Sequence, residues 1–182
     1  MEPRSVSKDD AEVGARPPEM GALYFFTGRA GAGKSTLARQ FSVDRHAILI
    51  CEDQWLARLF GGVASLAEYL ERRGRIRQLL ADWVPQLLGA GHSVVFDFGG
   101  NTIKDRAWVR SLFAKLGAEH ELHYLVADEA LCRRRIRERN RTKPQGIYWG
   151  DVSDELFDEV NRYFQPPTHD EGFTVVEHRV NE

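Results

Sequence analysis

Eight consecutive residues, 28–35 (GRAGAGKS), have the types and spacing needed to hold phosphate groups. The glycines let the backbone curl so that successive N–H groups point inward at an anion. A helix that begins directly after the loop adds the positive end of its dipole. Lys34 would reach the β- and γ-phosphates of a nucleotide, and the Ser35 hydroxyl would coordinate Mg²⁺.

The loop follows an apolar stretch typical of a buried strand and precedes a helical pattern, which is the context that the motif requires. We therefore expect ATP to bind here together with Mg²⁺. The residues predicted to bind the nucleotide are Gly28, Arg29, Ala30, Gly31, Ala32, Gly33, Lys34, Ser35 and Thr36.

Other classes of P-loop protein fit the sequence less well than a kinase. A GTPase switch normally carries an Asn-Lys-x-Asp motif that reads the base, and this sequence has no such tetrapeptide. A motor ATPase needs a sensor arginine, an oligomer surface and a larger domain than 182 residues allow. The sequence favours a kinase.

Arginines gather late in the chain, where they are six of the nine residues in the range 133–141. In small P-loop kinases such a segment is a lid that closes over the γ-phosphate, excludes water and supplies positive charge. Arg135 and Arg139 share one helix face, so we expect them to contact the transferring phosphoryl group, with Arg141 in reserve. The lid is expected to span about residues 133–150. The alternatives are a solvated helix face and a patch that binds RNA or DNA.

An acidic pair follows the second apolar stretch, at the edge where parallel sheets bind their ligands. We expect Asp53 to be the general base that accepts the proton of an attacking hydroxyl. Two alternatives remain open. Asp53 could cap a helix that starts at Gln54, or Glu52 could replace it if the strand register is one residue off.

A second aspartate, Asp97, ends the apolar run VVFD in the manner of a Walker B residue. We expect it to hold Mg²⁺ with Ser35 or to contact the substrate. The alternative is a capping role in the turn that follows. Thr102 is expected to cap the next helix, and Arg106 either reaches the site or lies exposed on the surface.

Apolar, β-rich runs alternate with helical patterns, which predicts an α/β fold with helices on both faces of a parallel sheet. Pro85 is expected to kink the longest helix. The strands are expected at residues 22–27, 47–51, 93–98, 122–126 and 173–176. The helices are expected at about residues 34–41, 54–60, 66–88, 103–116 and 153–164, with a further, arginine-rich helix after Asp128.

Composition limits the class of protein further. A net charge of −2 provides no general attraction to nucleic acid or anionic membranes. Two cysteines cannot form a disulfide framework, which favours a reduced, cytoplasmic setting, and no apolar run approaches the ~20 residues that span a bilayer. Residues 1–20 are polar and contain three prolines, so we expect them to be disordered and residues 21–182 to form one domain.

Four motifs together resemble the small P-loop kinases related to zeta toxins, chloramphenicol phosphotransferase and the polynucleotide kinase domain. They are GRAGAGKST, an acid after the second strand, VVFD on the third, and RIRERN at the lid. Many bacterial members of this group are called AAA-type ATP-binding proteins. The resemblance covers about residues 23–176.

The resemblance implies a P-loop NTPase fold, with a five-stranded sheet in the order 2-3-1-4-5, and ATP-dependent phosphorylation of a hydroxyl. It places the base at Asp53 and lid arginines at Arg135 and Arg139, and it implies that Glu171 lies near the nucleotide base. Polynucleotide kinases tend to carry an arginine three residues after the base, where this chain has Leu56. That departure argues against a nucleic-acid end as the substrate.

We therefore interpret the sequence as that of a kinase that phosphorylates a small-molecule hydroxyl on an antibiotic, a nucleotide-sugar or a metabolite. The alternatives are a polynucleotide 5′-end kinase and an ATP-sensing protein without turnover. The segment 61–88 is expected to form the wall that contacts the acceptor.

Overall fold

The computed structural model describes residues 19–61 and 66–181, so most of the segment expected to be disordered lies outside the described residues. Five parallel strands form one sheet in the order β2-β3-β1-β4-β5. This confirms the predicted α/β fold and the strand order that the resemblance implies. The strands are β1 (Leu23–Gly28), β2 (Ile48–Cys51), β3 (Val94–Asp97), β4 (His120–Val126) and β5 (Val175–Arg179).

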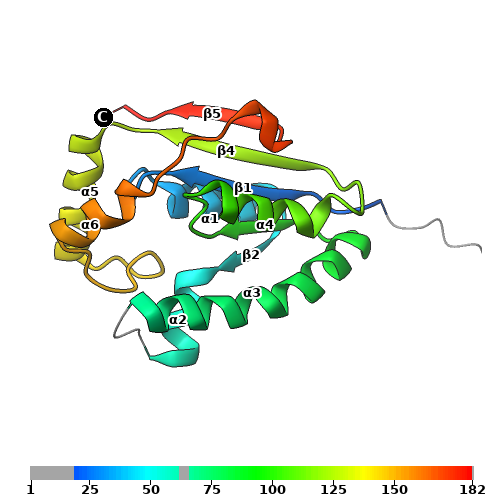
Figure 1. Ribbon diagram of the computed structural model, residues 1–182, viewed down its shortest axis with the longest axis horizontal. Coiled ribbons are helices and arrows are strands. Elements are labelled where there is room, and N and C mark those ends of the chain that lie inside the picture. Colours follow the sequence, from blue (N-terminus) through cyan, green and yellow to red (C-terminus); the bar gives the residue numbers. More distant parts are fainter. Residues whose placement is uncertain (1–18, 62–65, 182) are drawn as a thin grey trace, which may run out of the picture.

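Helices cover both faces of the sheet (Figure 1). Leu23 and Phe25 of β1 belong to the core under α3 and α4, whereas Tyr24 and Phe26 belong to the core under α1 and α5. Because β1 is buried on both faces, its sequence is apolar from Leu23 to Phe26 rather than alternating. The helices are α1 (Lys34–Asp44), α2 (Glu52–Phe60), α3 (Leu66–Gly89), α4 (Ile103–Phe113), α5 (Glu129–Thr142) and α6 (Asp154–Arg162), with a 3₁₀ turn, η2 (His169–Glu171).

Three helices that border the site begin at side-chain caps. Thr102, Asp128 and Ser153 each accept a hydrogen bond from the backbone N–H three residues later, at 3.1, 2.7 and 3.2 Å. These caps fix where α4, α5 and α6 start, and they confirm the predicted role of Thr102.

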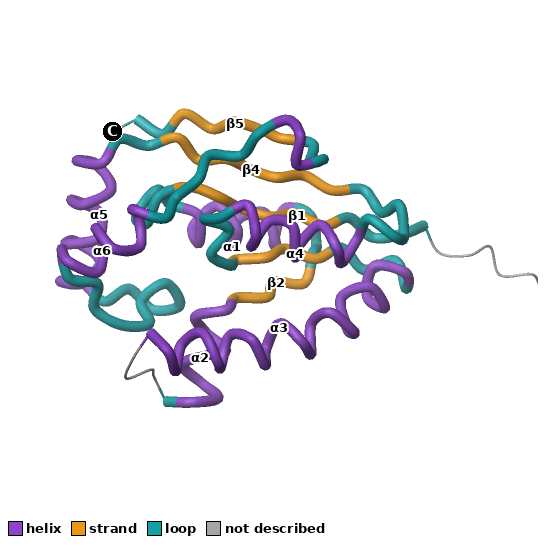
Figure 2. Tube along the Cα trace, viewed as in Figure 1, coloured by secondary structure: helices purple, strands orange, loops and turns teal. Residues whose placement is uncertain are grey.

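The long helix α3 runs unbroken through Pro85, and β5 begins two residues later than predicted and extends to Arg179. The loop between α5 and α6 curls back toward the start of α2 (Figure 2). No helix in the described part of the chain is both long enough and apolar enough to cross a membrane.

Candidate active site

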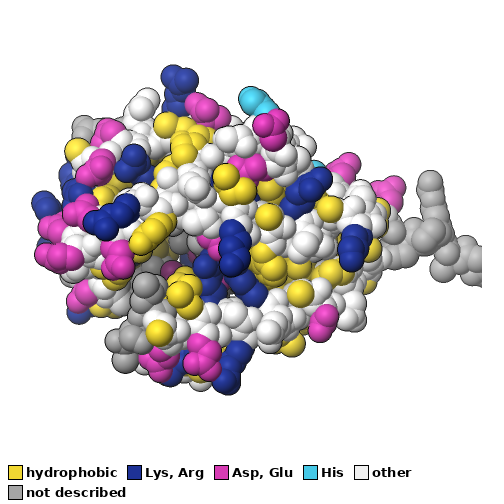
Figure 3. Space-filling view, viewed as in Figure 1, with side chains coloured by type: hydrophobic (Ala, Val, Ile, Leu, Met, Phe, Trp, Pro, Cys, Tyr) yellow, Lys and Arg dark blue, Asp and Glu magenta, His cyan; other side chains and the backbone are white. Residues whose placement is uncertain are grey.

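A cleft of about 2280 Å³ opens at the carboxyl ends of the central strands, between the phosphate-binding loop, α2, α3 and the α5–α6 region. Figure 3 shows a hollow on this side of the molecule, with basic side chains gathered beside it. The predicted catalytic residues and metal ligands that line the cleft are Lys34, Asp53, Arg135, Arg139, Ser35 and Asp97. The predicted nucleotide-binding residues that line it are Ala30, Gly31, Gly33, Lys34, Ser35 and Thr36.

The phosphate-binding loop is packed tightly against the lid helix. Gly31 and Gly33 have positive φ angles of 81° and 105°, which side-chain-bearing residues rarely adopt. A Cβ atom on Gly31 would lie 2.5 Å from the carbonyl oxygen of Cys132 in α5. The predicted residues Gly28, Arg29 and Ala32 are not among those that line the cleft, and Ala32 is buried beneath the loop.

The ammonium group of Lys34 lies against the loop. Its Nζ donates hydrogen bonds to the carbonyl oxygens of Gly28 (2.8 Å) and Arg29 (3.0 Å). Burial lowers the pKa of Lys34, and the carboxylate of Asp97 opposes that shift. The side chain is therefore already positioned where phosphates would enter.

Asp97 joins the phosphate-binding loop to β2. The Ser35 hydroxyl donates to Asp97 Oδ1 at 3.0 Å, and the Cys51 thiol donates to Asp97 Oδ2 at 3.3 Å. Burial, followed by the negative charge of Asp97, raises the pKa of Cys51, which therefore stays a thiol. This thiol was not foreseen as a partner of Asp97.

The oxygen atoms of Ser35 and Asp97 fit Mg²⁺, which prefers hard oxygen ligands. Within the described residues, no group of three or more His, Cys, Asp or Glu side chains could hold a metal ion.

The neighbouring acids Glu52 and Asp53 have different surroundings. Because α2 begins at Glu52 with Cys51 as its N-cap, Asp53 lies within the first turn, and the idea that it caps a helix from Gln54 is wrong. Asp53 is exposed to the cleft, whereas Glu52 is buried. Partial removal from bulk water on the cleft floor, together with repulsion from Glu52 and Asp97, raises the pKa of Asp53 to about 6.

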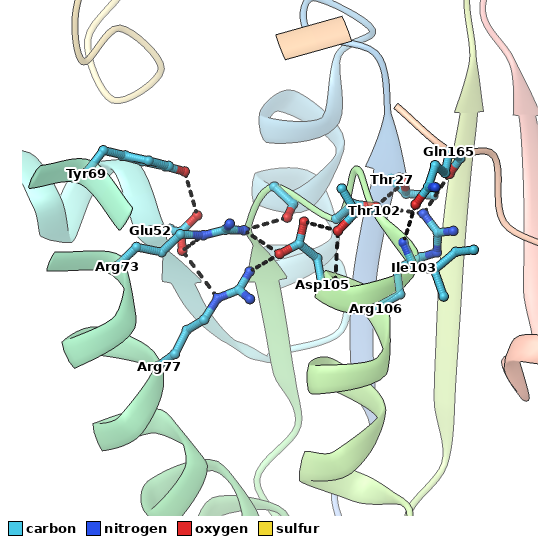
Figure 4. A network of polar contacts seen from close by, with 12 residues as sticks. Thr27, Glu52, Tyr69, Arg73, Arg77, Thr102, Ile103, Asp105, Arg106 and Gln165 are labelled. Carbon is cyan, nitrogen blue, oxygen red and sulfur yellow. Dashed lines mark hydrogen bonds and ion pairs between the residues drawn. The ribbon is translucent and has the colours of Figure 1, made fainter. Parts of the chain in front are cut away.

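Glu52 is held by side chains of α3 (Figure 4). It accepts hydrogen bonds from Arg73 Nε at 2.8 Å and from the Tyr69 hydroxyl at 3.4 Å. Arg73 Nη2 also bonds to the Gly99 carbonyl oxygen at 2.8 Å and pairs with Asp105 at 3.2 Å. Glu52 also lines the cleft but is bound to a structural network, so Asp53 is the member of this acidic pair that has no cation bonded to it among the described residues.

The lid helix α5 has two faces with different partners. Arg135 donates to the Ala32 carbonyl oxygen at 3.3 Å, and the charge of Arg139 acts on Asp53 across the cleft. Burial lowers the pKa of Arg139, and the attraction of Asp53 opposes the shift. The structure therefore brings both predicted lid arginines to the nucleotide side of the cleft.

The other arginines of α5 bind acids on the lid itself. Arg133 bonds to Glu129 and Asp158, and Arg137 bonds to Asp154 at 2.9 Å. The reserve candidate, Arg141, is largely exposed and bonds to Glu138 of its own helix. All five of these arginines line the cleft, but among the described residues only Arg135 and Arg139 have no carboxylate bonded to them, whereas Arg133, Arg137 and Arg141 are bonded to acids of α5 or α6.

Three contacts that sequence reasoning missed hold the lid in place. Asn140 bonds to both backbone groups of Val152, at 2.9 and 3.2 Å, and Arg39 of α1 bonds to the carbonyl oxygen of Gly146. Asn161 of α6 accepts a hydrogen bond at 3.0 Å from the N–H of Ala30 in the phosphate-binding loop. No local spacing signals such contacts because each joins residues that only the fold brings together.

Arg106 is neither a site residue nor an exposed one. It is fully buried and pairs with Glu171 through two hydrogen bonds, at 2.6 and 2.8 Å. It also donates to the carbonyl oxygens of Gly100 and Gln165. Glu171, which the resemblance places near the nucleotide base, is thus bound to Arg106 and does not line the cleft.

Comparison with known proteins identifies the family and the fold. A family model described as an AAA domain matches residues 23–167. An adenylyl-sulfate kinase from Shewanella denitrificans is 30% identical over 173 residues, covering 89% of this chain and 77% of the relative. A presumed kinase from Chloroflexus aurantiacus has a TM-score of 0.68 and 20% identity, over 88% of each chain. The APS kinase CysC of Mycobacterium tuberculosis, in complex with AMPPNP and APS, has a TM-score of 0.54 and 20% identity, over 88% of this chain and 90% of that one.

The solved structures support the fold, and the family model and the curated relative extend over most of the chain. The family model and the curated relative confirm the predicted kinase class, and they confirm the resemblance to small P-loop kinases as far as the family. This chain belongs to the AAA-domain family and is an ATP-binding P-loop kinase.

Proposed function

We propose that this protein transfers the γ-phosphoryl group of ATP to a hydroxyl group of a small molecule. The observation that carries the proposal is the placement of Asp53, which faces the same cleft as Lys34 and Arg139 while its neighbour Glu52 is paired and buried. A carboxylate that lies beside a phosphate site and has no cation bonded to it can accept a proton from an incoming alcohol.

In the proposed reaction, Asp53 takes the proton of the acceptor hydroxyl as that oxygen forms a bond to the γ-phosphorus. The bond from the γ-phosphorus to the bridging oxygen breaks, and ADP leaves with the electron pair. Lys34, Arg135 and Arg139 stabilise the charge on the transferring group. Mg²⁺, when bound, would neutralise charge between the β- and γ-phosphates. Ser35 and Asp97 are the residues that would hold it.

The lid would separate transfer to an alcohol from transfer to water. Asn140 and Arg39 hold the α5–α6 loop near the cleft, which also contains Trp149 in its lining. A closed lid excludes water from the γ-phosphate and favours the bound acceptor.

The acceptor is the part of the function that needs an experiment. Adenylyl sulfate is the first compound to test because the curated relative is an adenylyl-sulfate kinase. Antibiotics, nucleotide-sugars, nucleosides, sugars and sugar acids complete the panel. A nucleic-acid 5′ end is disfavoured because Leu56, at the position of the expected arginine, is buried in the core.

The test is an ATP-dependent phosphorylation screen of this panel, read by mass spectrometry of the products. We expect a phosphorylated alcohol with the wild type and none with Lys34→Ala at saturating ATP. A product from oligonucleotide ends alone would support a polynucleotide kinase instead. ATP binding without any product would support a nucleotide sensor and contradict the proposed function.

A further inference from the structure

The side of the cleft away from the phosphate-binding loop has its own chemistry. We define the acceptor wall by six lining residues from α2, α3, the segment after β3 and the first turn of α4: Leu56, Tyr69, Arg73, Phe98, Asn101 and Asp105. It adjoins Asp53, so an alcohol whose oxygen reaches that carboxylate would lie against this wall. The charge of the wall therefore bears on which acceptor can bind.

The basic residue of the wall, Arg73, and its neighbour Arg77 are already paired with acids. Arg73 contacts both Glu52 and Asp105, and Arg77 of the next helical turn lies 2.9 Å from Asp105. Figure 4 shows these two arginines between the two carboxylates. The side chains of Arg73 and Arg77 are only 13% and 16% exposed. Two positive and two negative charges cancel, so the network offers no net attraction to an anion.

Two further carboxylates lie beside this neutral network, and the cations that act on them, Lys34 and Arg139, are on the nucleotide side, where the phosphates of ATP would take up their charge. Asp53 has no cation bonded to it among the described residues, and Asp97 lies on the same floor of the cleft. Burial of an anionic group near these carboxylates would cost free energy unless a free cation compensated it. In the described residues of the acceptor wall, no such cation is present.

The uncharged residues of the wall indicate which hydrogen-bonding groups the ligand should carry. Leu56 and Phe98 line the wall but are almost fully buried by their neighbours, so they add little apolar surface for a ligand. Asn101 also lines the cleft, and its Oδ1 is a buried acceptor without a hydrogen-bond donor in the described residues. A ligand rich in O–H or N–H donors would complement such a wall.

We propose that the acceptor is an uncharged or positively charged alcohol, such as an amino alcohol or an amino sugar, and that it carries no anionic group. This inference rests on the proposed function and deepens it by giving the charge class of the acceptor. It separates this chain from the chemistry named by its curated relative, since adenylyl sulfate is an anion.

The test uses acceptors that differ in charge on the same skeleton. One set is glucosamine, glucose and glucuronate, and a second is adenosine and adenylyl sulfate. The compounds of both sets are part of a larger panel of alcohols. The panel has a cationic, a neutral and an anionic group, and the three groups are matched in molecular size. We expect the best cationic or neutral acceptor to exceed the best anionic one by at least about tenfold in kcat/KM.

An anionic compound as the best acceptor would overturn this inference and leave the proposed kinase function intact. If no compound in any set is phosphorylated while ATP binds, the proposed function fails and the inference fails with it. These two failures are distinguishable because only the first yields a phosphorylated product.

A variant tests whether the pairing of Arg73 and Arg77 with carboxylates causes the preference for acceptors without negative charge. Asp105→Asn removes one carboxylate from the network and keeps a side chain that can hydrogen-bond, so the pair Arg73 and Arg77 gains a net positive charge. We expect preference for the anionic member of a matched pair to rise about tenfold, as kcat/KM or as an inhibition constant. The control is Asp82→Asn on the exposed face of α3, which should change the preference less than twofold. A folded Asp105→Asn protein with unchanged preference would contradict the account.

Discussion

The two sides of the cleft use the same residue type in opposite ways. On the nucleotide side, Arg135 and Arg139 face the cleft without a carboxylate bonded to either guanidinium, according to the contacts of the described residues. On the acceptor wall, Arg73 and its neighbour Arg77 are bound by Glu52 and Asp105. The charge of a site is therefore decided by which arginines have partners, not by how many arginines are nearby.

The lid helix repeats this difference within a single element. All four line the cleft, but Arg133 and Arg137 neutralise acids of α5 and α6, whereas Arg135 and Arg139 have no carboxylate bonded to them among the described residues. Pairing one set reduces the repulsion among like charges on neighbouring turns. The helix can therefore carry cleft-facing positive charge and remain folded.

The largest effect is expected from Lys34→Ala on the nucleotide side. Removal of this ammonium takes away charge stabilisation of the transferring phosphoryl group, and kcat/KM should fall by about 10³-fold or more. The matched control is Lys104→Ala on the exposed side of α4, which should leave kcat/KM within twofold. A Lys34→Ala enzyme within tenfold of the wild type would show that the loop does not serve the reaction.

A smaller loss is expected from single changes at the lid. Arg139→Ala or Arg135→Ala should lower kcat by about 10²-fold because each removes one cation from the transition state. Arg137→Ala, whose side chain is 67% exposed and bonds to Asp154, should lower kcat less than threefold. Equal losses of kcat for Arg137→Ala and Arg139→Ala would contradict the different roles assigned to these two arginines of α5.

The pH dependence should report the raised pKa of Asp53. A general base must be deprotonated, so kcat/KM for the acceptor should rise with pH and level off above a pKa of about 6. The measurement is a profile of kcat/KM from pH 4.5 to pH 8, with the residual activity of Asp53→Asn as the control. A flat profile between pH 5 and pH 7 would rule Asp53 out as the base.

The smallest effect is expected on stability. Because the pKa of Asp53 is raised on folding, its favourable contribution is present below the unfolded-state pKa of about 4 and is lost as the pH rises through about 6. Asp53→Asn should therefore have a slightly higher Tm than the wild type at pH 7. This difference in Tm should vanish near pH 4. Thermal unfolding at both pH values checks this, with Asp82→Asn as the control. A lower Tm for Asp53→Asn at pH 7 would contradict the assigned shift.

Sequence reasoning predicted the parts of the site that depend on local spacing. The phosphate-binding loop must lie between β1 and α1, and residues four apart such as Arg135 and Arg139 must share a helix face. The ends of parallel strands meet at one edge, which is why Asp53 and Asp97 line one cleft. Each of these predictions needs only a short stretch of chain and the strand order.

The contacts that the sequence did not predict join distant parts of the chain. Arg106 was expected near the site or on the surface, yet a partner 65 positions away, Glu171, holds it in the core. The distinction between Glu52 and Asp53 as candidate base likewise depends on α3, because Arg73 of this helix pairs with Glu52 and not with Asp53. Such pairings follow from tertiary packing, so residue types and spacing alone leave them open.

The central claim is that Asp53 is the base of a phosphotransfer site, and one measurement tests it most directly. Wild type and Asp53→Asn are compared at saturating ATP with the best acceptor from the screen, together with the Kd for ATP. The account predicts that kcat/KM for the acceptor falls by at least about 10²-fold while the Kd for ATP changes less than threefold. Transfer by Asp53→Asn within threefold of the wild type would contradict the account.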